Sequence, residues 1–181
     1  MTKLPRILIA LAAVVAVLLA KPVIAQTPSL VVDVNLTSSL GIGSGVGTIT
    51  LKDTKYGLVL APDLFNLTPG IHGFHVHENP DCGTKFSRIQ AVPGSAAGGH
   101  YDPLDADAHE GPYGSGHLGD LPPLLVATDG TATTPILAPR LESSFIKARS
   151  LMIHAGGDNF SDEPAALGGG GARLACGVIP E

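Results

Sequence analysis

The stretch Gly47-Thr48-Ile49-Thr50-Leu51-Lys52 alternates apolar and polar side chains with a period of two. This period is typical of a half-buried strand that turns one face toward a core and the other toward solvent. Similar short segments rich in β-branched residues recur at 31–36, 57–60, 71–77, 124–127, 131–137, 150–154 and 174–179. Apart from a turn of helix expected at 142–147, no segment has a sustained helical period. About eight short antiparallel strands predict an all-β protein, a Greek-key β-sandwich or flattened barrel.

Two long segments interrupt this rhythm of strands. Residues 78–123 (the first loop) contain Gly, Pro, Asp and His throughout, and residues 155–172 (the second loop) are rich in Gly and Asp. Loops of this length are uncommon inside a compact domain and are usually functional or disordered. Because histidines flank or occupy both loops, a bound metal is the expected ordering force.

Glycines also mark shorter turns. Asp129-Gly130 lies between two expected strands and indicates a hairpin. The run 41–47 has glycine at every second position but fits neither the dinucleotide-binding nor the Walker pattern, so we interpret it as a turn.

The amino-terminal segment has the pattern of a secretory signal peptide. Lys3 and Arg6 precede an unbroken apolar run from Ile7 to Ala20, and small residues lead to Ala25. We therefore expect a signal peptide at 1–25 and a mature domain at 26–181. The alternative is an uncleaved membrane anchor, but 14 apolar residues fall short of the approximately 20 that a span needs. The mature protein is expected to be exported and to have no membrane contact.

The charge balance is acidic. The 181 residues include 16 Asp and Glu against 11 Lys and Arg, a formal net charge of -5. Loss of Lys3, Arg6 and Lys21 with the signal peptide leaves 8 basic residues and a net charge of -8. An acidic chain without a long basic run argues against nucleic acid as a partner.

The two cysteines, Cys82 and Cys176, both belong to the mature domain. An even number of cysteines in an oxidising compartment predicts a disulfide between them. Closing a loop of nearly a hundred residues would stabilise the fold by about 4–5 kcal/mol in the chain-entropy view. The alternative is a pair of buried free thiols.

Histidines supply the strongest chemical signal. His75 and His77 are two apart in an expected strand and therefore share a face, whereas His72 lies on the other face and is expected to be structural. Five further candidate ligands lie in the first loop or at the end of a strand, namely His100, His109, His117, Asp120 and His154. Imidazoles with one carboxylate suit zinc or copper. Seven ligands exceed one tetrahedral site, so they fit two metals that share a histidine, zinc with Asp120 beside copper with imidazoles alone.

Five segments around these residues resemble the copper/zinc superoxide dismutase family, in its bacterial periplasmic branch. They are Gly73–Glu78, Gly98–Pro103, Gly116–Pro122, Met152–Asn159 and Gly171–Val178. The resemblance extends over residues 32–179. It implies a periplasmic enzyme that converts superoxide to oxygen and hydrogen peroxide through alternate reduction and oxidation of a histidine-bound copper beside a structural zinc.

The resemblance also implies roles for individual residues. Copper would be bound by His75, His77, His100 and His154, and zinc by His100, His109, His117 and Asp120. His100 would bridge both metals and could supply a catalytic proton. Asp158 would link one ligand of each metal, and Arg173 would hold the superoxide anion. The alternatives are a solvated surface acid for Asp158 and a core-packing arginine for Arg173.

Lys85 and Arg88 are candidates for attracting superoxide, because acidic residues of the second loop surround the expected entrance. Their alternative role is that of solvated surface charges. Two other functions stay open, a copper/zinc storage protein of the same fold and an exported zinc hydrolase. A homodimer and a monomer are both compatible with the sequence, which has no unambiguous interface stripe.

Overall fold

Strands and loops make up the part of the protein that the computed structural model describes, residues 29–181. The strands are β1 (Ser29–Ser38), β2 (Gly41–Thr54), β3 (Gly57–Leu64), β4 (Gly70–His72), β5 (Phe74–His77), β6 (Lys85–Ser87), β7 (Gln90–Val92), β8 (Leu124–Val126), β9 (Ile136–Ala138), β10 (Ser150–His154) and β11 (Arg173–Val178). Short 3-10 turns lie at η1 (Ser95–Ala97), η2 (Ser143–Phe145) and η3 (Leu167–Gly169). Residues 29–181 contain no α-helix, and none of their helical turns is long and apolar enough to span a membrane. The expected all-β class is confirmed.

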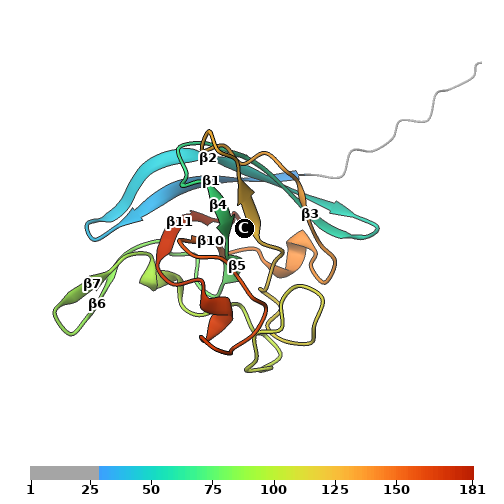
Figure 1. Ribbon diagram of the computed structural model, residues 1–181. Coiled ribbons are helices and arrows are strands. Elements are labelled where there is room, and N and C mark those ends of the chain that lie inside the picture. The colour runs from blue at the N-terminus through green and yellow to red at the C-terminus, as the bar shows by residue number, and fades with distance from the viewer. Residues whose placement is uncertain (1–28) are drawn as a thin grey trace, which may run out of the picture.

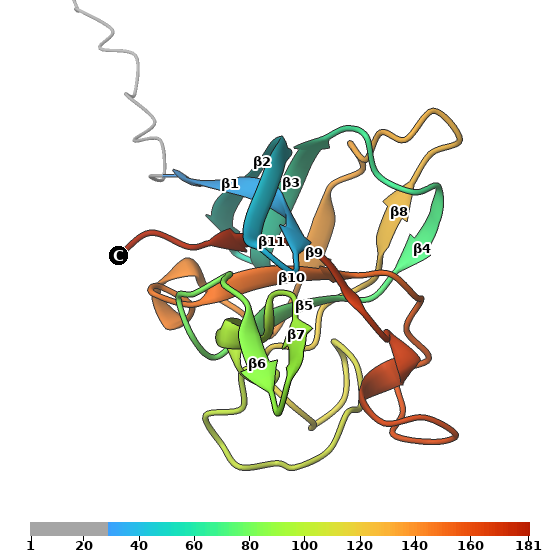
Figure 2. The ribbon, with the colours of Figure 1, turned by 90° about the vertical axis from the view of Figure 1, so that its left-hand side faces the viewer.

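One curled antiparallel sheet forms the body of the molecule. Its seven strands follow the order β5-β10-β11-β1-β2-β3-β9, and β4 pairs with β8 in a separate two-stranded sheet. Figure 2 shows the strands curving around a common interior. β1 lies between β2 and β11, so the first and last strands of the described residues are paired. This order agrees with the expected Greek-key sandwich or flattened barrel.

The core follows the alternation read from the sequence. On β2, Ile49 and Leu51 are fully buried, whereas Thr50 between them is half-exposed. Leu58 and Leu60 on β3 and Phe74 on β5 are buried in the same hydrophobic cluster. Burial of this apolar surface stabilises the sheet and gives the β5 histidines a rigid base.

The expected strand at 71–77 is two strands in different sheets, separated by Gly73. The Gly73 N–H donates to Gly156 O and its carbonyl accepts from His154 N, each at 2.8 Å. These bonds to the second loop and to the end of β10 replace the pairing that a continuous strand would have. The break therefore brings the second loop beside β5.

Three further expectations were wrong in part. Of the expected strand 131–137, only Ile136 and Leu137 are strand, as part of β9, and Ala132 forms an isolated bridge with Leu64. The Asp129-Gly130 turn forms, since Gly130 N donates to Ala127 O, but β8 and β9 belong to different sheets and make no hairpin. The run 41–47 is the first half of β2 rather than a turn. The expected helical turn near 142–147 is η2.

The two long loops have the expected bounds, joining β5 to β8 and β10 to β11. The first loop contains an unexpected hairpin, β6–β7, which projects from the body (Figure 1). A disulfide between Cys82 and Cys176, with Cα atoms 5.7 Å apart, ties this loop to β11 as expected. The proposed signal peptide, residues 1–25, lies outside the described residues.

Candidate metal centre

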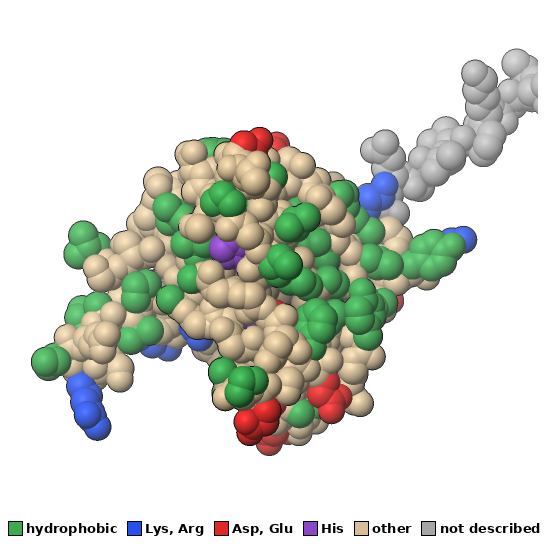
Figure 3. Space-filling view, in the orientation of Figure 1, with side chains coloured by type: hydrophobic (Ala, Val, Ile, Leu, Met, Phe, Trp, Pro, Cys, Tyr) green, Lys and Arg blue, Asp and Glu red, His purple; other side chains and the backbone are tan. Residues whose placement is uncertain are grey.

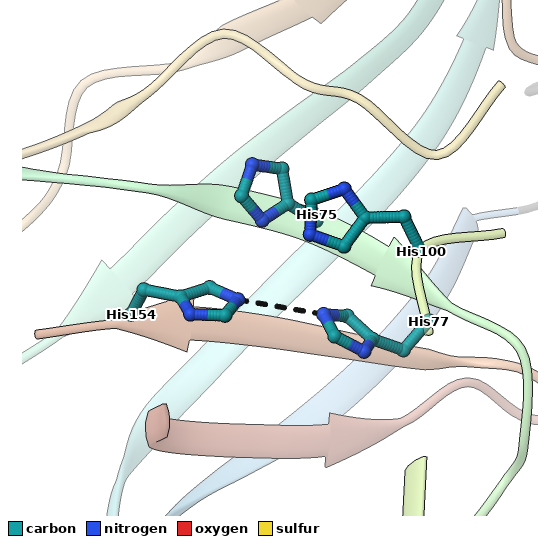
Figure 4. Close-up of side chains that lie close together, drawn as sticks. All are labelled: His75, His77, His100 and His154. Atoms are coloured by element: carbon teal, nitrogen blue, oxygen red, sulfur yellow. Dashed lines mark hydrogen bonds between the residues drawn. The ribbon is translucent and has the colours of Figure 1, made fainter. Parts of the chain in front are cut away.

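Four imidazoles converge where β5 meets the end of β10. His75 and His77 lie opposite Met152 and Ser150 of β10, and their shared face brings both rings toward His154 and His100. One ligand atom from each of the four residues lies within 4.8 Å of the others. His154 Nε2 is 3.4 Å from His77 Nε2, drawn as the dashed line in Figure 4. We call His75, His77, His100 and His154 the four-histidine cluster.

A second group of ligands shares His100. His100, His109, His117 and Asp120 also have ligand atoms within 4.8 Å of one another, and we call them the His–Asp cluster. Asp120 Oδ1 lies 3.1, 3.0 and 3.4 Å from the Nδ1 atoms of His100, His109 and His117, respectively. All seven residues of the two clusters are buried, His117 being the most exposed at 8 %. His100 thus turns one ring nitrogen toward each cluster.

Several of these buried atoms have no hydrogen-bond partner among residues 29–181. They are His75 Nδ1, His100 Nε2, His109 Nδ1, His117 Nδ1 and Asp120 Oδ2. Leaving buried polar atoms unpaired is costly, and a convergent set of them indicates that a ligand satisfies them. Imidazoles alone suit copper, and imidazoles with one carboxylate suit zinc. The residues therefore fit a copper and a zinc ion that share His100.

Burial keeps the four-histidine cluster in the form that binds metals. It lowers the pKa of His75 to about 3 and that of His154 to about 4. Burial also lowers the pKa of His77 and of His100. At neutral pH these imidazoles are uncharged and hold a free lone pair for a metal.

The His–Asp cluster has a different electrostatic balance. Burial disfavours the charged form of His109, but the carboxylates of Asp120 and Asp158 outweigh it and raise the pKa of His109 to about 9. Burial likewise opposes ionisation of Asp120, and the neighbouring imidazoles of His100 and His109 more than offset it, holding the pKa of Asp120 below its usual range. The anionic carboxylate is the form that coordinates zinc.

Asp158 is hydrogen-bonded to one histidine of each cluster. Its Oδ2 lies 2.7 Å from His75 Nε2 and its Oδ1 lies 2.8 Å from His109 Nε2. Each ring therefore donates its Nε2 hydrogen to Asp158 and presents Nδ1 to a metal, the arrangement in which outer partners orient metal ligands. On His109, whose raised pKa retains a second proton at neutral pH, metal binding would displace the proton at Nδ1. The hydrogen bonds from His109 and His75 outweigh burial and hold the pKa of Asp158 below its usual range. The alternative for Asp158, a solvated surface acid, is therefore wrong, because its side chain is buried.

Arg173 lies at the mouth of the four-histidine cluster. It lines a pocket of about 240 Å³ together with His77, His100 and His154. Its Nη1 donates to Gly94 O and its Nη2 to Gly98 O, both at 2.6 Å. Gly98 has a φ of 81° and a ψ of -156°, a backbone conformation that only glycine adopts readily. The guanidinium is fixed, half-buried and cationic, and it borders a pocket that has room for a small anion.

Sequence reasoning missed several groups around the site. The Gly98 carbonyl lies 3.0 Å from His77 Nδ1 as well as accepting from Arg173, so one carbonyl orients both. Asp162, expected only as a charge near the entrance, accepts from the backbone N–H of His109 at 2.8 Å. His72 is outside both clusters and lies 2.7 Å from the carbonyls of His154 and Thr68, a structural role as expected. Backbone carbonyls leave no residue-type signal by which they could have been found.

Comparisons with known proteins agree with this geometry. Residues 45–179 match the family described as copper/zinc superoxide dismutase (SODC). The chain is 56% identical over 153 residues to superoxide dismutase (Cu-Zn) 1 of Salmonella typhimurium, covering 83% of this chain and 86% of that protein. The Cu/Zn superoxide dismutase structure from Brucella abortus is 49% identical with a TM-score of 0.82, over 84% of this chain and 99% of that one. The solution structure of the monomeric enzyme from Salmonella enterica is 52% identical with a TM-score of 0.77, over the same shares. The chain belongs to the copper/zinc superoxide dismutase family.

Proposed function

We propose a division of roles for this copper/zinc superoxide dismutase. Copper is bound by the four-histidine cluster and zinc by the His–Asp cluster, with His100 bridging the two metals. The observation that supports this most directly is the shared position of His100 between two groups whose ligand atoms each lie within 4.8 Å. When bound, copper supplies the one-electron couple of the reaction, and zinc, which has no redox chemistry, supplies a fixed charge.

The chain's own residues bind the substrate and deliver a proton. Arg173 holds the superoxide anion, because its guanidinium is fixed by two carbonyls and faces the pocket with no carboxylate ion-paired to it in residues 29–181. Two superoxide anions and two protons become one oxygen and one hydrogen peroxide. His100 Nε2, when it is not bound to copper, would hold one of these protons and give it to the peroxide product. Asp158 keeps the tautomers of His75 and His109 constant through the cycle.

Two alternatives make different demands on the same residues. A storage protein needs no anion site, yet Arg173 lines the pocket beside the histidines. A zinc hydrolase needs an open zinc position, whereas the His–Asp cluster offers four ligands. The deciding experiment measures superoxide consumption by protein whose copper and zinc contents have been determined. Dismutation that rises with copper content supports the proposal, and copper-loaded protein without dismutation contradicts it.

Asp158→Asn is expected to weaken binding of both metals by about 10- to 100-fold. An amide has one oxygen, so it accepts from only one of His75 and His109, and its NH₂ group opposes the other ring's N–H. Competition with a chelator, followed by metal analysis, measures both affinities. The matched control is Asp129→Asn in the exposed turn before β9, which should leave them unchanged. Equal affinities in Asp158→Asn and the unaltered protein would refute the linking role.

The double variant Lys85→Ala/Arg88→Ala is expected to dismutate superoxide about threefold to tenfold more slowly at low ionic strength, with a flatter salt dependence. Both side chains are exposed on the β6–β7 hairpin, and Figure 3 shows cationic side chains projecting there, apart from the acidic ones along the lower edge. Lys52→Ala/Lys55→Ala makes the same change of charge elsewhere and serves as control. An unchanged rate and salt slope in the hairpin variant would exclude steering.

We also propose that residues 1–25 direct the chain to the periplasm and are then removed, because they have the pattern of a secretory signal peptide. The mature protein is then residues 26–181. A monomer and a homodimer are both compatible with the sequence, and light scattering on the purified mature protein distinguishes them. Fractionation of cells that express the full chain, with mass spectrometry of the mature amino terminus, tests export and cleavage together.

A further inference from the structure

An arginine outside both clusters contacts the segment that joins two ligands of the His–Asp cluster. Arg140 follows β9, the edge strand of the large sheet, and its side chain is half-buried. Its Nη2 donates to Gly116 O at 2.6 Å, and its Nη1 donates to His117 O at 3.3 Å and Gly111 O at 3.4 Å. No carboxylate forms an ion pair with it within residues 29–181. The guanidinium is thus committed to loop carbonyls.

The contacted segment is a closed arc between His109 and His117. Residues 110–116 include three glycines, so the arc has little conformational preference of its own. At its neck the His117 N–H donates to Ala108 O at 2.9 Å, and a Cβ on Gly116 would lie 2.3 Å from that same oxygen. Arg140 reaches both limbs of the arc, Gly111 on one and Gly116 on the other. The planar fork of the guanidinium bridges them, which a single ammonium cannot do.

The other side of the arc is held by the second loop, because His109 N donates to Asp162 and His109 Nε2 to Asp158. Both of those partners belong to a loop that is itself free of strands. Arg140 instead comes from the segment after β9, which pairs with β3 of the sheet. It therefore connects the arc to the rigid part of the fold, and a ligand set held by a rigid element binds its metal more tightly.

We propose that Arg140 is a positioning residue for zinc, holding the 110–116 arc so that His109 and His117 keep their ligand geometry before the metal arrives. This rests on the proposed function, in which the His–Asp cluster binds zinc. Ordering a glycine-rich arc costs conformational entropy, and Arg140 removes that cost from the binding step. Arg140 does not contact the four-histidine cluster, so its effect concerns zinc and not copper.

Arg140→Met keeps the aliphatic stem and removes every donor, and it is expected to raise the zinc dissociation constant about tenfold or more. Arg140→Lys has a single ammonium group in place of the guanidinium fork, so its zinc dissociation constant should lie between those of Arg140→Met and the unaltered protein. Zinc affinity is measured by chelator competition, copper affinity in parallel, and the absorption spectrum of Co²⁺ placed in the zinc site reports its geometry. Lys147→Met, which removes an exposed charge after η2, is the control. Weaker zinc binding, an altered Co²⁺ spectrum and unchanged copper affinity support the proposal.

Unchanged zinc affinity in Arg140→Met overturns the proposal, as does an equal loss for zinc and copper, since that would indicate general destabilisation. The unfolding midpoint of the metal-free proteins is measured alongside. If Arg140→Met does not fold, Arg140→Lys decides, and zinc binding as tight as in the unaltered protein overturns the proposal. His117→Ala tests the underlying site separately. Zinc binding that survives His117→Ala contradicts the proposed zinc ligands, whatever Arg140 does.

Discussion

Replacing His154 with alanine should lower the rate of superoxide dismutation by at least about 100-fold at fixed metal supply. Changes to the outer partners of metal ligands already alter metal affinity by about 10- to 100-fold, so loss of a ligand has at least the upper effect. His154 comes from β10, whereas the other members of its cluster come from β5 and the first loop. Its loss opens one side of the copper position and leaves the His–Asp cluster complete.

The result is informative because the two clusters should respond differently. Zinc content of His154→Ala should match that of the unaltered protein, since His154 lies outside the His–Asp cluster. Circular dichroism checks that the sheet is retained. A variant that keeps both its copper and its full rate would show that the catalytic copper lies elsewhere.

Removal of the disulfide should lower the unfolding free energy more than any other substitution proposed for this protein. The Cys82→Ser/Cys176→Ser variant is expected to lose about 4–5 kcal/mol of unfolding free energy in the metal-free state. The crosslink spans 94 residues and so excludes a large set of expanded unfolded conformations. Urea unfolding of the metal-free protein, followed by circular dichroism, measures the difference.

Reduction of the unaltered protein provides the matched comparison. It should destabilise the metal-free fold by a similar amount, because it breaks the same crosslink without changing side-chain volume. A double variant as stable as the disulfide-bonded protein would mean that the crosslink contributes no net free energy to the fold.

Much of the fold follows from local pattern. The alternation at 47–52 predicted β2, and the bounds of both long loops were correct because strands on either side have clear apolar periods. The break at Gly73 was missed. A glycine within a strand pattern can mark an irregularity, but the division into two sheets depends on hydrogen bonds to the distant Gly156 and His154. The β6–β7 hairpin was not predicted because its turn lacks the glycine that usually signals a hairpin. Arg88 adopts the positive φ there, at 58°.

The site likewise contains residues that the sequence predicted and residues that only the tertiary structure shows. Residue type and two-residue spacing pointed to His75 and His77, and the family resemblance assigned the other ligands, all of which the structure brings into the two clusters. Arg140 was not identified, because it lies more than twenty residues from His117 and acts on backbone carbonyls. Contacts of side chains with distant backbone atoms require the tertiary structure.

The two proposed metal sites share one ligand, His100. Crystals of the copper- and zinc-loaded protein, measured on either side of the copper and zinc absorption edges, locate each metal separately. We expect a copper peak among His75, His77 and His154 and a zinc peak among His109, His117 and Asp120, with His100 about 2.0–2.1 Å from each. Copper outside the four-histidine cluster, or His100 bound to only one metal, would contradict the proposed assignment of the two metals.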